Sequence, residues 1–164
     1  MSKKFLITGG AGFIGSNYVA RLLKRGEDVT IFDNLSRAGS KMNIEWLKTT
    51  KSNSFKLIEE DVRNSQLLEN AVKDIDVIVH LAGQVAVTTS VLNPREDFEI
   101  NALGTFNVLE AARKSKNKPI VLYASTNKVY GGMEEVRVQE NDSDYSYVDY
   151  PFGIPENFSL DFHS

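Results

Sequence analysis

Short apolar runs rich in β-branched residues alternate with longer stretches of helical periodicity through the first 131 residues. The runs predict five strands, and the intervening stretches predict helices that begin near residue 14 and elsewhere cover 42–47, 65–72 and 97–114. The strands are expected at 4–8, 29–32, 55–58, 77–81 and 120–124. This alternation is typical of βαβ units, so the sequence predicts an α/β domain with a parallel sheet.

Residues 132–164 show neither the period of a strand nor that of a helix. The segment is acidic and aromatic, and it contains Pro151 and Pro155. We expect a long surface segment there, and long segments of this kind in compact domains are usually functional or disordered. The predicted organisation is therefore a core over 1–131 followed by an irregular segment over 132–164.

Composition excludes several classes of protein. The 164 residues carry a formal net charge of -3 and contain no cysteine, which argues against a strongly basic nucleic-acid binder, a disulfide framework and a thiolate zinc site. No apolar run approaches the roughly 18–20 residues of a membrane helix. The apolar run near the N-terminus is too short for the hydrophobic region of a signal peptide. We expect a cytoplasmic protein with no metal, no nucleic acid and no membrane among its partners.

A glycine-rich motif, Thr8–Gly15 (TGGAGFIG), follows the first predicted strand and opens the first predicted helix. Glycines allow a tight turn and let a pyrophosphate approach the backbone. The free N–H groups and the positive end of the helix dipole would then face that anion. A simple helix cap is the alternative, but the strand–turn–helix context favours a dinucleotide site.

An aspartate, Asp33, follows Gly15 by 18 residues, at the end of the second predicted strand. A carboxylate there can accept hydrogen bonds from both hydroxyls of an adenosine ribose and would repel a 2′-phosphate. NAD is therefore favoured over NADP, although Arg37 could accommodate that phosphate. A turn aspartate before Asn34 is the alternative interpretation.

Three further polar groups follow predicted strands. Asp61-Val62 could meet the adenine amino group, but a solvated loop acid is nearly as well supported. In His80–Gln84 (HLAGQ) the small residues would let a cofactor approach the backbone, whereas His80 itself is better explained as a hydrogen-bonded structural histidine. Ser125–Gly131 (STNKVYG) brings two hydroxyls and a lysine to the end of the fifth strand, and spacing alone does not separate a site from a polar turn.

Taken together, these motifs resemble the extended short-chain dehydrogenase/reductase family of nucleotide-sugar epimerases and dehydratases. The matching phrases span residues 3–131 in the family's order: TGGAGFIG, FDNLSR, EEDVRN, HLAGQ, NALGT and STNKVYG. Within the family, GQVAVTTS, DFEIN and LDFHS are similar to the enzymes that epimerise CDP-deoxysugars at C2. The resemblance implies the N-terminal part of a Rossmann-type doubly wound sheet and a cytoplasmic role in making lipopolysaccharide O-antigen sugars.

The resemblance also implies a mechanism, in which bound NAD oxidises the sugar at C2 and returns the same hydride to the opposite face. Alignment on the VYG phrase gives Thr126 the hydrogen bond to the reacting hydroxyl, with Ser125 as the fallback. The implied cofactor contacts are Gly9, Gly12, Phe13, Ile14, Gly15, Asp33, Asn34, Ser36, Arg37, Asp61, Val62, Leu81, Ala82, Gly83, Gln84 and Asn101.

The family's Tyr-x-x-x-Lys motif is not found in these 164 residues, whose last lysine is Lys128. We therefore expect a chain that is inactive alone and leads toward that motif and a substrate domain, with a homodimer or larger oligomer for the complete protein. The dimer would use apolar residues of the helix at 97–114.

The alternative functions are those of a 4-epimerase or 4,6-dehydratase of another nucleotide sugar, and of a non-catalytic NAD-binding module. Asn127-Lys128 after Thr126 argues against a dehydratase, where an Asp-Glu pair is usual.

Overall fold

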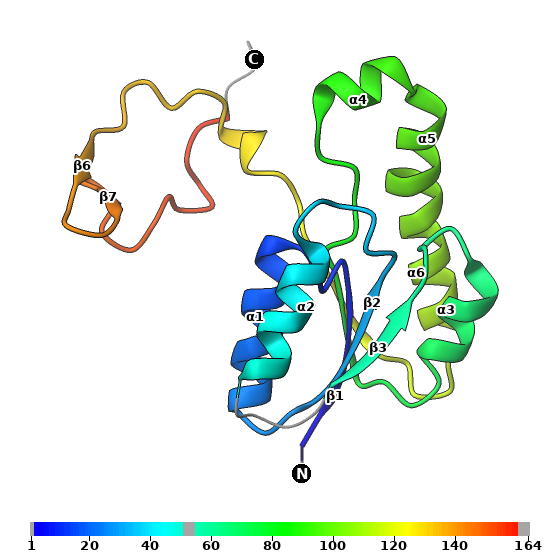
Figure 1. Ribbon diagram of the computed structural model, residues 1–164. Helices are drawn as coiled ribbons and strands as arrows, with labels where there is room; N and C mark the ends of the chain where they lie inside the picture. Colours follow the sequence, from blue (N-terminus) through cyan, green and yellow to red (C-terminus); the bar gives the residue numbers. More distant parts are fainter. Residues whose placement is uncertain (1, 51–54, 161–164) are drawn as a thin grey trace. The chain divides into compact units, whose positions relative to one another are not determined.

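Five parallel strands form the sheet of the first unit, residues 1–124 (Figure 1). The computed structural model describes residues 2–50 and 55–160. The sheet has the order β3-β2-β1-β4-β5. Its strands are β1 (Lys4–Thr8), β2 (Asp28–Asp33), β3 (Lys56–Glu59), β4 (Val77–His80) and β5 (Ile120–Tyr123). The chain reverses its direction of winding between β1 and β4, so the predicted Rossmann-type, doubly wound α/β fold is confirmed.

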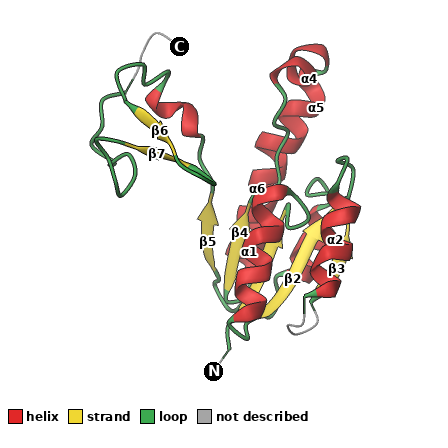
Figure 2. Cartoon of the chain, turned by 60° about the vertical axis from the view of Figure 1, so that its left-hand side comes forward, coloured by secondary structure: helices red, strands yellow, loops and turns green. Residues whose placement is uncertain are grey.

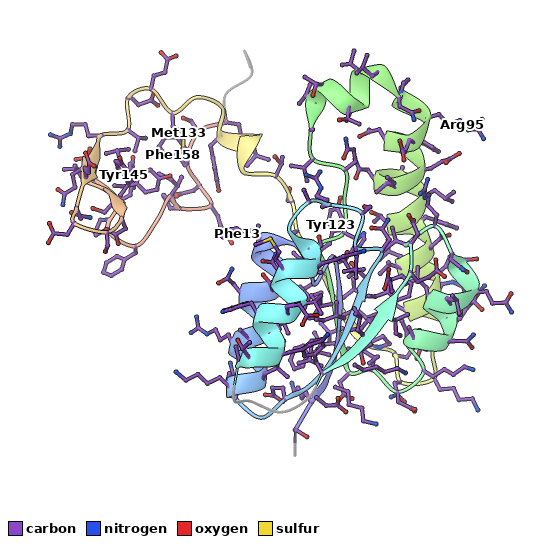
Figure 3. The ribbon with its side chains drawn as sticks, viewed as in Figure 1. Phe13, Arg95, Tyr123, Met133, Tyr145 and Phe158 are labelled. Atoms are coloured by element: carbon purple, nitrogen blue, oxygen red, sulfur yellow. The ribbon has the colours of Figure 1, made fainter. Side chains whose placement is uncertain are left out.

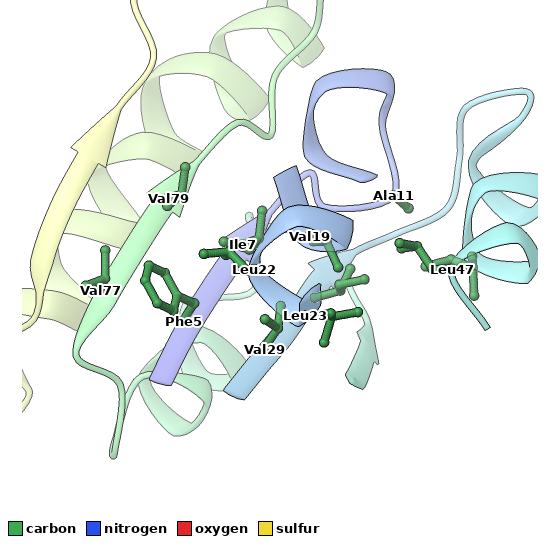
Figure 4. Close-up of a cluster of buried hydrophobic side chains, with 12 residues drawn as sticks. Phe5, Ile7, Ala11, Val19, Leu22, Leu23, Val29, Leu47, Val77 and Val79 are labelled. Atoms are coloured by element: carbon green, nitrogen blue, oxygen red, sulfur yellow. The ribbon is translucent and has the colours of Figure 1, made fainter. Parts of the chain in front are cut away.

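Helices cover both faces of the sheet, as Figure 2 shows. On one face, α1 (Phe13–Lys24) and α2 (Ser40–Thr49) pack on the apolar residues of β1, β2 and β4 that point to that face. Figure 4 shows this cluster. On the other face α3 (Ser65–Ala71) and α6 (Gly104–Lys114) pack on the alternate residues of the same strands. Because strands buried on both faces are apolar throughout, β1 and β4 read as continuous hydrophobic runs in the sequence.

The outer strand β5 is covered on one face only. Val121 packs against the cluster under α3 and α6. Ile120 and Leu122 pair in register with Val77 and Val79, which belong to the α1 cluster, yet both are exposed. No helix in the described residues covers this part of the sheet, which is therefore an apolar surface beside α1.

The long helix expected over 97–114 is interrupted. It begins as α5 (Pro94–Phe98), continues as the π-helix η1 (Glu99–Leu103) and ends as α6. Asn93 caps its start by accepting a hydrogen bond from the Glu96 N–H at 3.3 Å, and Pro94 fits the first helical position. A further helix, α4 (Val87–Leu92), was not predicted because it buries no residue and so lacks an amphipathic pattern.

The second unit, residues 125–164, begins with the 3-10 turn η2 (Asn127–Tyr130). The sequence predicted no regular element after residue 131, but β6 (Val138–Glu140) and β7 (Tyr145–Tyr147) form an antiparallel hairpin. Strands of three residues are too short to show an alternation. The rings of Tyr130 and Tyr150 both meet the ring of Phe158 edge-on. Across the described parts of both units, no helix has the length and apolar character that would span a membrane.

Candidate cofactor site

The candidate site lies at the carboxyl ends of β1, β2 and β4. Ligands of doubly wound folds bind in the crevice at this edge, where the order of the strands reverses. Three loops follow these strands: the glycine loop after β1, residues 34–39 after β2 and residues 81–86 after β4. They contain most of the predicted cofactor residues, which the fold therefore brings to one edge of the sheet.

The glycine loop leaves no space for side chains at two positions. Gly9 has a left-handed φ of 68°, and a Cβ there would lie 2.6 Å from the Ala82 nitrogen in the loop after β4. A Cβ at Gly15 would lie 2.7 Å from the Cα of Gly10. The first glycine therefore allows two loops to approach each other, and the last allows α1 to pack against the turn.

The first turn of α1 presents unpaired backbone donors. The N–H groups of Phe13, Ile14 and Gly15 donate to no acceptor in the described part of the chain. The Phe13 side chain is 83% exposed at this helix end (Figure 3), and Gly12 before it has no side chain to cap the helix. Three open donors at the positive end of a helix dipole are suited to bind an anionic group such as a pyrophosphate.

The carboxylate of Asp33 stands at the end of β2 and supports the glycine loop. Its Oδ2 accepts the N–H of Ala11 at 3.0 Å, and its Oδ1 accepts the N–H of Leu35 at 2.9 Å. Each carboxylate oxygen can accept a second hydrogen bond. The bond to Leu35 is the turn contact that the sequence offered as the alternative interpretation of Asp33, whereas the bond to Ala11 in the glycine loop was not predicted. The ribose contact stays a prediction.

The loop after β2 is held by polar contacts of its own residues. The Asn34 Oδ1 accepts the N–H of Ser36 at 3.1 Å. Arg37 reaches across the crevice and donates to the Oε1 of Gln84 at 3.2 Å. This bond joins the loop after β2 to the loop after β4.

The carboxylate of Asp61 is fully used by protein donors. It accepts two bonds from the Arg63 guanidinium at 2.8 and 2.9 Å, one from the Arg63 N–H at 2.9 Å and one from the Asn34 amide at 2.9 Å. The side-chain hydrogen bonds from Arg63 lower the pKa of Asp61 to about 2, against the opposing effect of burial. An adenine amino group would have to displace one of these donors. The N–H of Val62, in contrast, has no acceptor in the described residues.

Residues 81–84 are held by the π-helix. The Asn101 Oδ1 accepts the N–H of Gln84 at 2.8 Å, and its Nδ2 donates to the Gln84 carbonyl at 3.2 Å. The same Nδ2 donates to Asp97 at 3.0 Å. A Cβ on Gly83 would lie 3.2 Å from the Asn101 Oδ1. The structure thus brings Leu81–Gln84 and Asn101 together, although they lie far apart in the sequence.

His80 at the end of β4 is 2% exposed and lies between two threonines. Its Nδ1 is 2.6 Å from the Thr8 hydroxyl, and its Nε2 is 3.0 Å from the Thr105 hydroxyl. Burial lowers the pKa of His80 to about 4, so the ring is neutral at pH 7. The interpretation of His80 as a hydrogen-bonded structural histidine agrees with these contacts. Thr105 and Asp97 were not predicted as site residues, and their only signal in the sequence is their helical spacing around Asn101.

Ser125 and Thr126, the predicted catalytic hydroxyls, belong to the second unit. Both residues are exposed and follow β5 after Ala124. Their catalytic roles stay predictions. In the LDFHS phrase, Asp161–Ser164 lie outside the described residues.

Comparison with known proteins places these features in a family. Residues 6–152 match the family model described as GDP-mannose 4,6 dehydratase. The chain is 45% identical over 163 residues to CDP-paratose 2-epimerase of Salmonella typhi, covering 98% of this chain and 48% of that protein. The chain therefore spans about half the length of this relative.

Solved structures share the fold. The UDP-Glc/GlcNAc 4-epimerase of Campylobacter jejuni matches with a TM-score of 0.70 and 34% identity, over 79% of this chain and 39% of that one. The UDP-glucose 4-epimerase of Thermus thermophilus, solved in complex with NAD, matches with a TM-score of 0.57 and 38% identity, over 67% of this chain and 33% of that one. NAD, the predicted cofactor, is thus confirmed for the family. With its glycine loop, doubly wound sheet and matched sequence, the chain belongs to the family of NAD-dependent nucleotide-sugar epimerases and dehydratases.

Proposed function

We propose that this chain binds NAD across the crevice at the carboxyl ends of β1, β2 and β4. The observation that carries the proposal is the set of open N–H donors of Phe13, Ile14 and Gly15 above a glycine loop that lacks space for side chains. These donors would bind the pyrophosphate. Gly9 and Gly12 would let the phosphates reach the backbone.

The two ends of the cofactor would meet different loops. At the adenosine end, Asp33 would accept the ribose hydroxyls, with Asn34, Ser36 and Arg37 around them. The unpaired N–H of Val62 would donate to the adenine ring, and Asp61 would act through its neighbours, since its own oxygens are occupied. At the other end, the half-buried segment Leu81–Gln84 would face the nicotinamide half.

Calorimetric titration with NAD and NADP tests this assignment. We expect the unmutated chain to prefer NAD, because a carboxylate and a 2′-phosphate about 4 Å apart repel by up to about 4 kcal/mol at an effective dielectric near 20. Asp33→Asn removes the charge, so it should narrow the preference; because it keeps only one of the two oxygens that accept the Ala11 and Leu35 N–H groups, it should also weaken the binding of both cofactors. Asp28→Asn is the matched control, since Asp28 lies at the opposite end of β2. Equal affinities for both cofactors in the unmutated chain would contradict the role of Asp33.

We further propose that the chain is the cofactor-binding part of an enzyme that epimerises a CDP-deoxysugar at C2. The 45% identity to CDP-paratose 2-epimerase over 98% of this chain supports this substrate class. When bound, NAD would supply transient oxidation and reduction at C2 with no net change of redox state. The Thr126 hydroxyl would hydrogen-bond the reacting sugar oxygen, with Ser125 in reserve. A cytoplasmic enzyme of O-antigen sugar synthesis fits this proposal.

A 4-epimerase of another nucleotide sugar is the second candidate, favoured by the match to the Campylobacter jejuni enzyme. Incubation of the complete protein with CDP-paratose or UDP-glucose, followed by NMR of the sugar protons, separates the two. Inversion at C2 of the CDP-sugar supports the first candidate. Inversion at C4 of UDP-glucose alone supports the second, and no turnover of either sugar by an NAD-loaded protein would favour a non-catalytic module.

The outer face of α6 supports a proposed homodimer of the complete protein. Phe106 and Leu109 are exposed on α6, as is Leu103 at the end of η1, whereas Ala112 is buried. Exposed apolar side chains grouped on one surface often mark an interaction site. Sedimentation measurements on the complete protein would give its oligomeric state directly.

A further inference from the structure

The buried histidine joins two segments of the candidate site through a chain of hydrogen bonds with a defined direction. The Thr105 hydroxyl donates its only hydrogen to the Asn101 carbonyl at 2.6 Å, so it must accept from the Nε2 of His80 at 3.0 Å. The neutral ring therefore carries its proton on Nε2 and accepts on Nδ1. The Thr8 hydroxyl donates to that Nδ1 at 2.6 Å.

The two ends of this chain lie in the loop after β4 and in the π-helix. At one end the Thr8 hydroxyl accepts the N–H of Ala82 at 3.3 Å. At the other end is Asn101, whose side chain binds both the N–H and the carbonyl of Gln84. The bonds thus close a ring that runs from the loop through the sheet to η1 and back to the loop.

The central members of this chain of hydrogen bonds, Thr8 and His80, are buried, whereas Thr105 and Asn101 are half-buried. Thr8 is 0% exposed, and the described part of the chain contains no buried side-chain polar atom without a partner. Hydrogen bonds in such surroundings are stronger than in water, and a broken link leaves a buried donor unpaired. The site requires a rigid group with a donor on one side, an acceptor on the other and no charge, and neutral histidine meets these conditions.

We propose that His80 is a positioning residue, which holds residues 81–84 against the π-helix in the arrangement that receives the cofactor. The inference rests on the proposed NAD site. His80 itself would touch neither cofactor nor substrate. It would act by fixing the backbone of Ala82 and Gln84 through Thr8, Thr105 and Asn101.

The test combines two NMR measurements with NAD titration of the 164-residue chain. First, ¹⁵N shifts of the His80 ring in the unmutated chain should show the proton on Nε2, and a proton on Nδ1 would overturn the proposal. Second, Thr105→Val should raise the amide exchange rates of Ala82 and Gln84 by about tenfold relative to Ile31 in β2, and should weaken NAD binding by about tenfold. Thr105→Ser, which keeps the hydroxyl, should restore both values.

Thr30→Val is the matched control, because Thr30 lies in β2 and makes no side-chain hydrogen bond within the described residues. It should change neither measurement. If Thr105→Val speeds exchange at Ile31 as much as at Gln84, or leaves NAD affinity unchanged, a positioning role is refuted. If the unmutated chain fails to bind NAD while the tautomer and exchange results hold, the proposed cofactor site fails and the linkage of loop to π-helix stands.

Discussion

The buried ring of His80 predicts that the chain loses stability in mild acid. Its pKa is about 4 in the folded chain, against 6.5 in an unfolded one. Between these values the unfolded state binds a proton that the folded state does not bind, so the stability is fully present above pH 6.5 and is lost as the pH falls toward 4. The two pKa values differ by about 2.5, which corresponds to about 3 kcal/mol at 1.36 kcal/mol per unit. Most of this, about 2 kcal/mol, falls between pH 7 and pH 5.

Urea unfolding followed by the fluorescence of Trp46, the only tryptophan, measures this loss. The matched variant is His80→Gln, which keeps a donor and an acceptor but does not titrate. We expect the unmutated chain to lose about 2 kcal/mol more than the variant between pH 7 and pH 5. Asp61 does not interfere, because its lowered pKa of about 2 affects stability only below 3.8. Equal pH dependence in the two proteins would refute the argument.

Three further perturbations follow from the structure. Gly15→Ala would place a Cβ 2.7 Å from a backbone carbon of the glycine loop, so we expect a loss of about 1–3 kcal/mol in thermal unfolding. Gly132→Ala, where the nearest atom is 3.5 Å away, should cost far less. In the complete protein, Thr126→Val should slow sugar turnover about a hundredfold while NAD stays bound, and Ser125→Ala should cost less; the reverse ranking would transfer the role to Ser125. Phe106→Glu should shift a sedimenting dimer toward monomer, and an unchanged sedimentation coefficient would remove α6 from the interface.

The sheet could be predicted because its strands are short, apolar and bounded by turn residues. The predicted 4–8 segment coincides with β1, and the other four predicted strands differ from the structure by one residue at an end or at both. The helix around 97–114 was located, but its π-helical turn was not, because a change in hydrogen-bond register leaves no mark on hydrophobic spacing. The exposed helix α4 was not predicted, because it buries no residue and its sequence therefore lacks an apolar face.

The predicted cofactor loops converge because the topology brings the ends of β1, β2 and β4 to one edge. What the sequence could not show was how these residues share their hydrogen bonds. The saturation of Asp61 by Arg63 depends on side-chain geometry that spacing does not encode. Likewise, the link from His80 to Thr105 joins residues 25 positions apart, and neither residue type alone indicates a partner.

The double use of Asp33 has a consequence for protein engineering. A change of preference toward NADP requires removal of the acidic residue after the second strand, because that residue disfavours the 2′-phosphate. Here the same carboxylate holds the N–H groups of Ala11 and Leu35, so the replacement would loosen the glycine loop together with the ribose contact. A successful exchange of cofactor would need a substitute acceptor for these two amides, introduced together with the cation that pairs with the 2′-phosphate. In this scaffold, cofactor choice and loop stability cannot be altered separately.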